Sequence, residues 1–318
     1  MKIKSIDWSR FGILFALILL IVGFSLLEET FLNFNNILNI LRQVSIVGIC
    51  AVGMTFVILT GGMDLSVGSV VGLSAVSSAI MLSDGVNPII AVAITLVFGA
   101  IIGLVNAYFI NNVGIAPIIM TLGMMTILRG VAYIISNGLP VYGIPKSYLF
   151  LGQGYIAKIP IPVIIMIIVF IIGSFILSKT TFGRSVYGIG GNIEASRLSG
   201  VNVKKAIYKI YMFAGVLYAL AGVILLARVN SGQPKAGDGY EMDVITACVL
   251  GGISLNGGEG RISGVIFGVL LMGTLANGMI MMNVPEFWQW VVKGAVLILA
   301  VSIDKLTLKS KNQVKTAV

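Results

Sequence analysis

Residues 85–128 contain no charged side chain, and the run is long enough for two membrane-spanning helices of about 20 residues each. The polar sequence NNVG at 111–114 marks the turn between them, and Pro117 lies near the start of the second helix, where its missing N–H does least harm. The mean hydropathy is +1.04 and 10% of the residues are charged, whereas about a quarter are charged in a soluble domain. The sequence therefore predicts one polytopic, all-α membrane domain over residues 1–318.

Apolar stretches like this one recur along the whole chain. Ten of them are long enough to be helices that cross a membrane within a crowded bundle. The predicted spans are 11–27, 44–60, 67–82, 88–110, 115–135, 161–177, 210–229, 244–255, 262–281 and 287–303. An even number of spans places both ends of the chain on the same side of the membrane.

The basic residues indicate which side that is. Residues 178–209 carry six Lys or Arg and a single acid, Glu194. If the N-terminus is cytoplasmic, the inner segments hold 14 of the 21 basic residues and the outer segments hold seven of the twelve acids. Basic residues concentrate on the cytoplasmic side of membrane proteins. We therefore expect both termini and the segment 178–209 to be cytoplasmic, and the net charge of +9 to reflect topology rather than nucleic-acid binding.

Two segments of the chain resemble each other at a constant offset. Residues 61–72 align with residues 257–268, and four glycines coincide. Each copy joins two apolar spans through a short polar turn and continues with glycines four residues apart, a spacing that lets helix backbones approach closely. This pattern predicts two pseudo-symmetric halves, and internal repeats with interrupted helices are common in transport folds.

The sequence lacks the residues that ATP binding by a P-loop, metal binding and nucleophilic catalysis require. No P-loop motif G-x-x-x-x-G-K-[ST] occurs, histidine is absent, and Cys50 and Cys248 are far apart in sequence, so we expect no catalytic site, metal or cofactor in this chain.

Ion-coupled transport normally needs ionisable groups at mid-membrane depth. Only Arg129 and Lys293 lie in or near apolar spans, and we expect both to snorkel toward the interface. Asp64 and Glu259 lie at predicted turns, so no buried carboxylate is expected, and this disfavours a secondary transporter.

Several dense motifs, in a fixed order, resemble the permease subunits of ribose-type ATP-binding-cassette sugar importers over nearly the full length. The matching stretches are 51–55 (AVGMT), 60–69 (TGGMDLSVGS), 181–184 (TFGR), 190–195 (GGNIEA), 197–201 (RLSGV), 233–243 (QPKAGDGYEMD) and 250–255 (LGGISL). Glu259 departs from the Lys that is common in ribose permeases, and this reversed charge could alter a gate or a partner contact.

The resemblance implies a dimeric permease, homo- or heterodimeric, in a bacterial plasma membrane. It also implies a cytoplasmic ABC ATPase that binds ATP and Mg, an extracytoplasmic sugar-binding protein, and a ten-helix importer fold. The implied cargo is a ribose-like monosaccharide. Nucleoside and branched-chain amino acid permeases share the architecture and remain alternatives, as do an ion-coupled transporter and a passive channel.

The first candidate site lies in the basic segment. Asn192 is a suitable N-cap and Glu194 suits the positive end of a helix dipole, so a short helix is expected over 190–199. Gly190 and Gly191 are expected to allow a sharp turn into this helix. By resemblance this is the coupling helix that docks on the ATPase. The residues assigned to coupling are Arg184, Gly190, Gly191, Asn192, Glu194 and Arg197.

The second candidate site comprises the two repeated turns. Polar groups where helices break can face a water-filled path rather than lipid. The candidates for a translocation path or gate are Thr60, Asp64, Ser66, Asn256 and Glu259. The alternative is that Asp64 and Glu259 only cap the helices that follow them.

Overall fold

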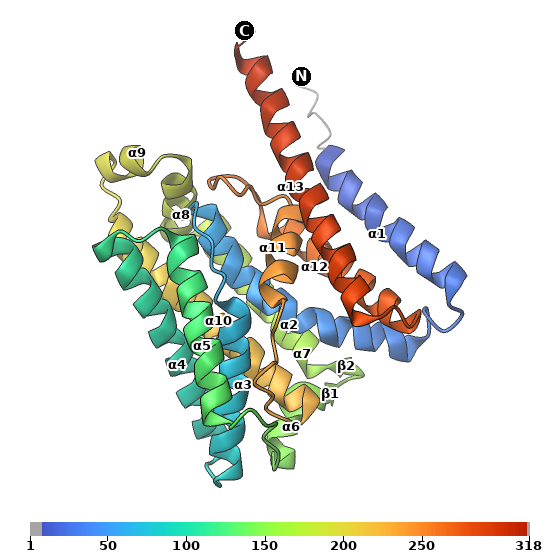
Figure 1. Ribbon diagram of the computed structural model, residues 1–318. Helices are drawn as coiled ribbons and strands as arrows, with labels where there is room; N and C mark the ends of the chain where they lie inside the picture. The colour runs from blue at the N-terminus through green and yellow to red at the C-terminus, as the bar shows by residue number, and fades with distance from the viewer. Residues whose placement is uncertain (1–7, 317–318) are drawn as a thin grey trace.

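A computed structural model describes residues 8–316, and this part of the chain is a bundle of helices with one short hairpin (Figure 1). The elements are α1 (Trp8–Leu27), α2 (Phe34–Leu59), α3 (Val67–Ser83), α4 (Pro88–Tyr108), the π-helix η1 (Phe109–Val113), α5 (Pro117–Ile135), α6 (Lys146–Gln153), β1 (Tyr155–Ile156), β2 (Ile159–Pro160), α7 (Ile161–Lys179), α8 (Thr181–Gly191), α9 (Ile193–Leu198), α10 (Val203–Val229), α11 (Tyr240–Leu250), α12 (Ile262–Met281) and α13 (Glu286–Thr316). The predicted all-α class is confirmed.

Six described helices are long and apolar enough to cross a membrane: α2, α4 with η1, α5, α7, α10 and α12. Residues 12–27 of α1 and the whole of α3 are shorter apolar helices. The chain is therefore a multi-pass membrane protein, while the number of ten crossings stays a prediction.

Several helix bounds differ from the predicted spans. Helix α2 begins ten residues earlier than expected, because Asn33 accepts a hydrogen bond from the N–H of Asn35 and starts the helix before the apolar stretch. Asn202 starts α10 in the same way through the N–H of Lys205. The span predicted at 244–255 is only the 11-residue helix α11.

The segment 178–209 is mostly helical. Helix α7 ends at Lys179, and the hydroxyl of Thr180 accepts a hydrogen bond from the N–H of Gly183 at 3.0 Å, which starts α8. Helix α9 and the first turns of α10 complete the segment. What the sequence presented as a basic loop is a pair of short helices between two long ones.

The core lies around α2 and α10, the two most buried of the six spans. Helix α10 packs against α2, α3, α4 and α6. Its contact with α4 is backbone to backbone, because a side chain on Gly99 or Gly103 would overlap carbonyl groups of α10, and one on Gly215 would overlap the carbonyl group of Gly99. Small residues of this kind permit close helix packing in lipid. Most apolar side chains of α4 and α5 are wholly or partly exposed, as in lipid-facing helices.

The helix bounds follow the internal repeat. When α1, α3 and α4 are shifted by 196 residues, their ranges become 204–223, 263–279 and 284–304, which fall on α10, α12 and α13. Helix α2 shifts to 230–255, where only Tyr240–Leu250 is helical. The ten residues 230–239 are thus an unwound counterpart of the first part of α2. Gly232, Pro234, Gly237 and Gly239 lie in this segment and oppose helix formation.

The two ends of the bundle differ. Helices α8 and α9 lie at the same end as the start of α1 and the end of α13, at the top of Figure 1. Helix α6 lies toward the opposite end. This arrangement agrees with a topology in which the basic segment and both ends of the chain share one face.

Cysteine labelling tests the orientation. Lys204 lies at the start of α10 and Lys158 in the turn of the β1–β2 hairpin. In a background without the buried Cys50 and Cys248, Lys204→Cys should react with an impermeant thiol reagent only from the cytoplasmic side, and Lys158→Cys only from outside. Labelling of both from the same side contradicts the topology.

Candidate functional site

The short helix predicted over 190–199 is present as α9, but it covers only Ile193–Leu198. The side chain of Asn192 accepts a hydrogen bond from the N–H of Ala195 at 2.9 Å and caps the helix. Glu194 lies in the first turn and pairs with Arg197 at 3.3 Å, and both side chains are about two-thirds exposed. An exposed pair of this kind contributes little to stability, so these charges are free to meet a partner.

The expectation for the two glycines is wrong. Gly190 and Gly191 both lie inside α8, and the chain turns at Asn192, whose backbone is extended. Neither glycine has a positive φ among the described residues. They also differ from each other, because a side chain on Gly191 would meet nothing within 4 Å, whereas one on Gly190 would overlap the carbonyl O of Leu59 and the amide N of Gly258.

The tip of α9 combines apolar and basic side chains. Leu198 is 89% exposed and Ile193 is 46% exposed, and Arg184 on α8 is also exposed. A hollow of about 650 Å³ lies between α9, η1 and the start of α10, and it is lined in part by Ile193 and Arg197. This end of the bundle therefore offers exposed apolar side chains beside positive charge.

Three segments meet at one point beneath α8, which we call the glycine junction: Gly190, the 59–62 turn and the 256–260 turn. The N–H of Gly258 donates a hydrogen bond to the carbonyl O of Leu59 at 2.9 Å. A Cβ on Gly257 would lie 2.8 Å from the amide N of Gly61. Gly61 and Gly257 occupy equivalent positions in the repeat, and both have a left-handed backbone, with φ of 77° and 81°. The two repeated turns and the predicted coupling segment are thus in direct contact.

Two side chains reinforce the glycine junction. The hydroxyl of Tyr187 on α8 donates a hydrogen bond to the carbonyl O of Gly260 at 3.0 Å, and burial raises the pKa of this tyrosine. Lys305 of α13 donates to the side-chain oxygen of Asn256 at 3.0 Å. The 256–260 turn therefore connects α8 with the C-terminal helix.

The first repeated turn is held by its own polar groups. Asp64 and Ser66 are 2% and 0% exposed, and one carboxylate oxygen of Asp64 accepts from both the N–H and the hydroxyl of Ser66, at 3.0 and 2.6 Å. Asn106 of α4 donates to the same hydroxyl at 3.3 Å. The hydroxyl of Thr60 bonds back to the carbonyl O of Val57. Asp64 makes no side-chain cap on α3; it shapes the turn before it.

The second repeated turn is more open. Asn256 and Glu259 are exposed, and the N–H of Ser254 donates to the carbonyl O of Glu259 at 3.0 Å. Arg261, which precedes α12 as its N-cap, makes no side-chain capping hydrogen bond. Of the five predicted gate residues, Asp64 and Ser66 are buried, Thr60 is partly buried, and Asn256 and Glu259 are exposed.

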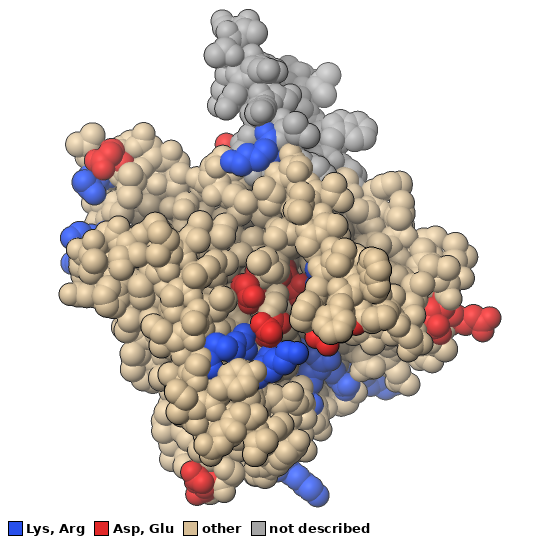
Figure 2. Space-filling model, viewed as in Figure 1, with Lys and Arg blue, Asp and Glu red and all other residues tan. Residues whose placement is uncertain are grey.

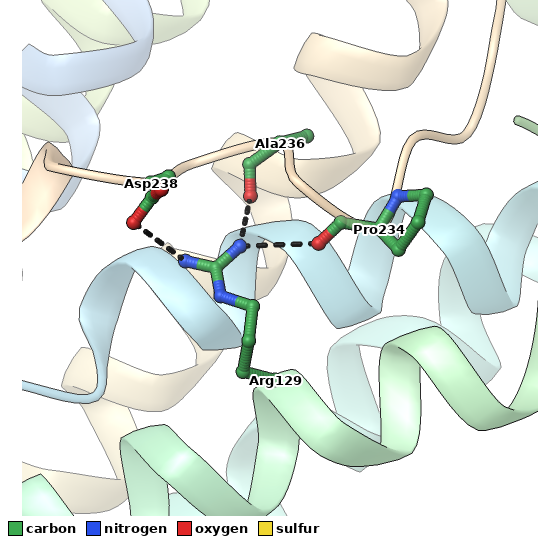
Figure 3. Close-up of polar contacts among 4 residues, drawn as sticks. All are labelled: Arg129, Pro234, Ala236 and Asp238. Atoms are coloured by element: carbon green, nitrogen blue, oxygen red, sulfur yellow. Dashed lines mark hydrogen bonds and ion pairs between the residues drawn. The ribbon is translucent and has the colours of Figure 1, made fainter. Parts of the chain in front are cut away.

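Sequence reasoning missed a polar site at the unwound segment 230–239. Nη1 of Arg129, on α5, donates to the carbonyl oxygens of Pro234 at 3.1 Å and Ala236 at 2.9 Å, and Nη2 lies 3.8 Å from Asp238 (Figure 3). Gly72 of α3 leaves room for this contact, because a Cβ there would overlap the carbonyl O of Ala236. Arg129 does not snorkel but satisfies backbone groups that would otherwise lack partners inside the membrane.

Two carboxylates in the first turn of α11 extend this site. Asp243 is 8% exposed and pairs with Lys293 of α13 at 2.7 Å. One oxygen of Asp243 and Oε2 of Glu241 are buried and have no hydrogen-bond partner among the described residues. The expectation of no buried carboxylate is therefore wrong, and so is the expectation that Lys293 snorkels. Both errors have one cause. The ten-span prediction treated 230–243 as an outer loop, whereas this segment enters the bundle.

Acidic and basic side chains gather side by side in a hollow of the face viewed in Figure 2, over the region where the unwound segment rises to α11 in Figure 1. A signal for this site exists in the sequence. Residues 230–239 contain three glycines and a proline, whereas the equivalent residues 34–43 contain neither residue type. Comparing the two repeats would have located the break.

The comparisons with known proteins identify the family of this chain. The family model described as "Branched-chain amino acid transport system / permease component" matches residues 36–301. The chain therefore belongs to this family of transport permeases. None of the solved structures compared with the chain matches it.

Named relatives cover almost the whole chain. The ribose import permease protein RbsC of Bacillus subtilis is 46% identical over 298 residues, which are 93% of this chain and 92% of the relative. RbsC of Escherichia coli K12 is 45% identical, with 92% of each chain covered. The L-arabinose transport system permease protein AraH of E. coli K12 is 40% identical, with 96% of this chain and 94% of the relative covered.

The two neighbouring glycines of α8 provide a matched test of the glycine junction. Gly190→Ala should lower the free energy of unfolding by about 1–3 kcal/mol, because the added methyl group overlaps backbone atoms that have little room to shift. Gly191→Ala should be neutral or slightly stabilising, because the position is open and alanine favours helix. Thermal unfolding of both purified variants in detergent measures this, and equal stability of the two variants contradicts the packing described here.

Proposed function

We propose that this chain is the membrane permease of an ATP-driven importer that passes a small monosaccharide, a pentose such as ribose, into the cell. The observation that carries this proposal is full-length similarity to permeases named for ribose and L-arabinose, at 40–46% identity. A xylose transport system permease protein, XylH of Haemophilus influenzae, is 35% identical over 95% of this chain. All three named sugars are pentoses.

We assign the driving force to a separate ATPase. The chain has no P-loop, so ATP and Mg would be bound by a cytoplasmic partner. The exposed tip of α9, with Leu198 and the Glu194–Arg197 pair, is the surface assigned to that partner. Movement of α8 would pass directly to the two repeated turns, because Gly190 contacts both. Asp64, Ser66, Asn256 and Glu259 would then change position with α8.

The remaining parts of the importer follow from the same proposal. Two permeases, identical or similar, form a dimer in the plasma membrane of a bacterium, with about ten helices in each copy and both termini in the cytoplasm. An extracytoplasmic binding protein delivers the sugar to the end that carries α6. The whole chain forms a single permease domain.

Branched-chain amino acid transport is the second candidate, because the matching family model carries that description. The named relatives favour sugars, and a competition assay separates the two. Vesicles that contain the permease, the ATPase and the binding protein should take up labelled ribose when ATP is supplied inside, and uptake should persist with an ionophore present. Competition by leucine but not by pentoses, or uptake that needs an ion gradient and no ATPase, contradicts the proposal.

Charge reversal on α9 tests its assignment to coupling. Glu194→Lys places a cation at a helix N-terminus, which costs about 0.3–1 kcal/mol and should leave folding intact. It should also weaken ATPase docking, because the partner surface would meet the opposite charge. We expect sugar-stimulated ATP hydrolysis and uptake to fall together at normal expression.

Asp84→Lys is the matched control, since Asp84 is an exposed acid at the far end of α3. It should leave both activities unchanged. Undiminished uptake by the Glu194→Lys variant would show that this surface does not dock the ATPase and that its basic residues only orient the chain in the membrane.

A further inference from the structure

The face around the unwound segment cannot face lipid. Asp238 exposes 55% of its side chain and lies 3.8 Å from Arg129, which is six residues from the end of the membrane-spanning helix α5. A charged carboxylate at this depth is costly in hydrocarbon and normally faces a water-filled cavity or a protein surface. An irregular backbone is tolerated at membrane depth under the same condition. The exposed side of the unwound segment therefore borders water or another protein.

The side chains around the unwound segment supply both hydrogen-bond donors and hydrogen-bond acceptors for a neutral ligand. Arg129 supplies N–H donors and is 21% exposed. Asp238 supplies an exposed carboxylate, and Glu241 holds an oxygen that is buried without a partner. Gly68 of α3 makes room for that carboxylate, because a Cβ at Gly68 would lie 2.7 Å from Oε2 of Glu241. An unpartnered buried carboxylate oxygen is costly unless another group donates to it.

Arg129, Asp238 and Glu241 come together because the helix of the second repeat is unwound where that of the first repeat is continuous. In the first repeat, residues 34–43 are helical, so their backbone groups bond within the helix. In the second, residues 230–239 release backbone groups and bring Asp238 and Glu241 next to α3 and α5. In secondary transporters built from repeats, discontinuous helices at the repeat interface typically form the solute site.

We propose that Arg129, Asp238 and Glu241 form the site through which this permease contacts its solute during transport, and that the ligand is a neutral polyol. A sugar hydroxyl can accept from the guanidinium group while it donates to a carboxylate, so neighbouring hydroxyl groups satisfy both kinds of partner. This inference rests on the proposed function, since it names where the pentose passes.

Neutral substitutions test the site. The probe is labelled D-ribose, and the preparation is the complete importer in liposomes, with its ATPase and binding protein. Glu241→Gln and Asp238→Asn should each lower the ribose taken up per ATP hydrolysed by about 10-fold, because a hydrogen bond to a charged acceptor is lost. ATP hydrolysis stimulated by the binding protein should persist, whereas a merely structural defect would lower hydrolysis and uptake together. Glu286→Gln, an exposed glutamate at the start of α13, is the matched control and should behave as the unchanged protein.

A labelling experiment tests the water-lined face without depending on transport. In a background without Cys50 and Cys248, Asp238→Cys should react with a charged, water-soluble thiol reagent, and ribose-loaded binding protein with ATP should slow the reaction. Ile127→Cys, on α5 and 60% exposed, should not react because it faces lipid. An unreactive cysteine at 238 means that a second protein surface covers this face, and this overturns the proposal.

The two levels of failure are distinct. If the unchanged importer takes up no pentose, the proposed function fails. If it takes up ribose and both neutral variants match it in uptake per ATP, only the assignment of this site fails.

Discussion

The hydrogen bond from the N–H of Gly258 to the carbonyl O of Leu59 joins the two halves of the repeat, and the end of the bundle that carries α8 and α9 is built around it. Gly190 of α8 lies against the same two groups, so three segments that are distant in sequence share one backbone contact. Since no side chain fits between Gly190 and these two groups, the backbone of α8 packs directly against the turns that lead to Asp64 and Glu259. Movement imposed on α8 can therefore reach both turns without passing through a loop.

A second constraint operates deeper in the bundle, where backbone groups have no water to bond. Helix α2 meets this constraint as a continuous helix, while its counterpart in the second repeat unwinds over 230–239 and relies on Arg129 for two of its carbonyl groups. The pseudo-symmetry is thus broken at one place. That place gathers the charges Arg129, Asp238 and Glu241, and it packs against α3, which directly follows the turn of Asp64 and Ser66. The glycine junction and the broken helix are therefore connected through one short helix.

Much of this architecture can be predicted from sequence. Apolar lengths located most of the spans, Asn192 predicted the cap of α9, and the offset of 196 located the equivalent turns. Other features depend on tertiary contacts. The turn conformation expected at Gly190 does not occur because the glycine serves close packing, a role that needs knowledge of Leu59 and Gly258. Arg129 and Lys293 were expected at the interface because hydropathy does not reveal that residues 230–243 enter the bundle and supply their partners.

The most direct test of the account is whether α9 and the 256–260 turn move as one body. Spin labels at Leu198→Cys and Glu259→Cys occupy exposed positions on these two segments, in a background without the native cysteines. Their separation can be measured by pulsed electron resonance in the complete importer, without nucleotide and in an ATP-trapped state. The account predicts an unchanged distance between these labels, while the distance from Leu198 to Lys158 at the opposite end changes. A separation between 198 and 259 that shifts during the cycle in a fully active importer would contradict it.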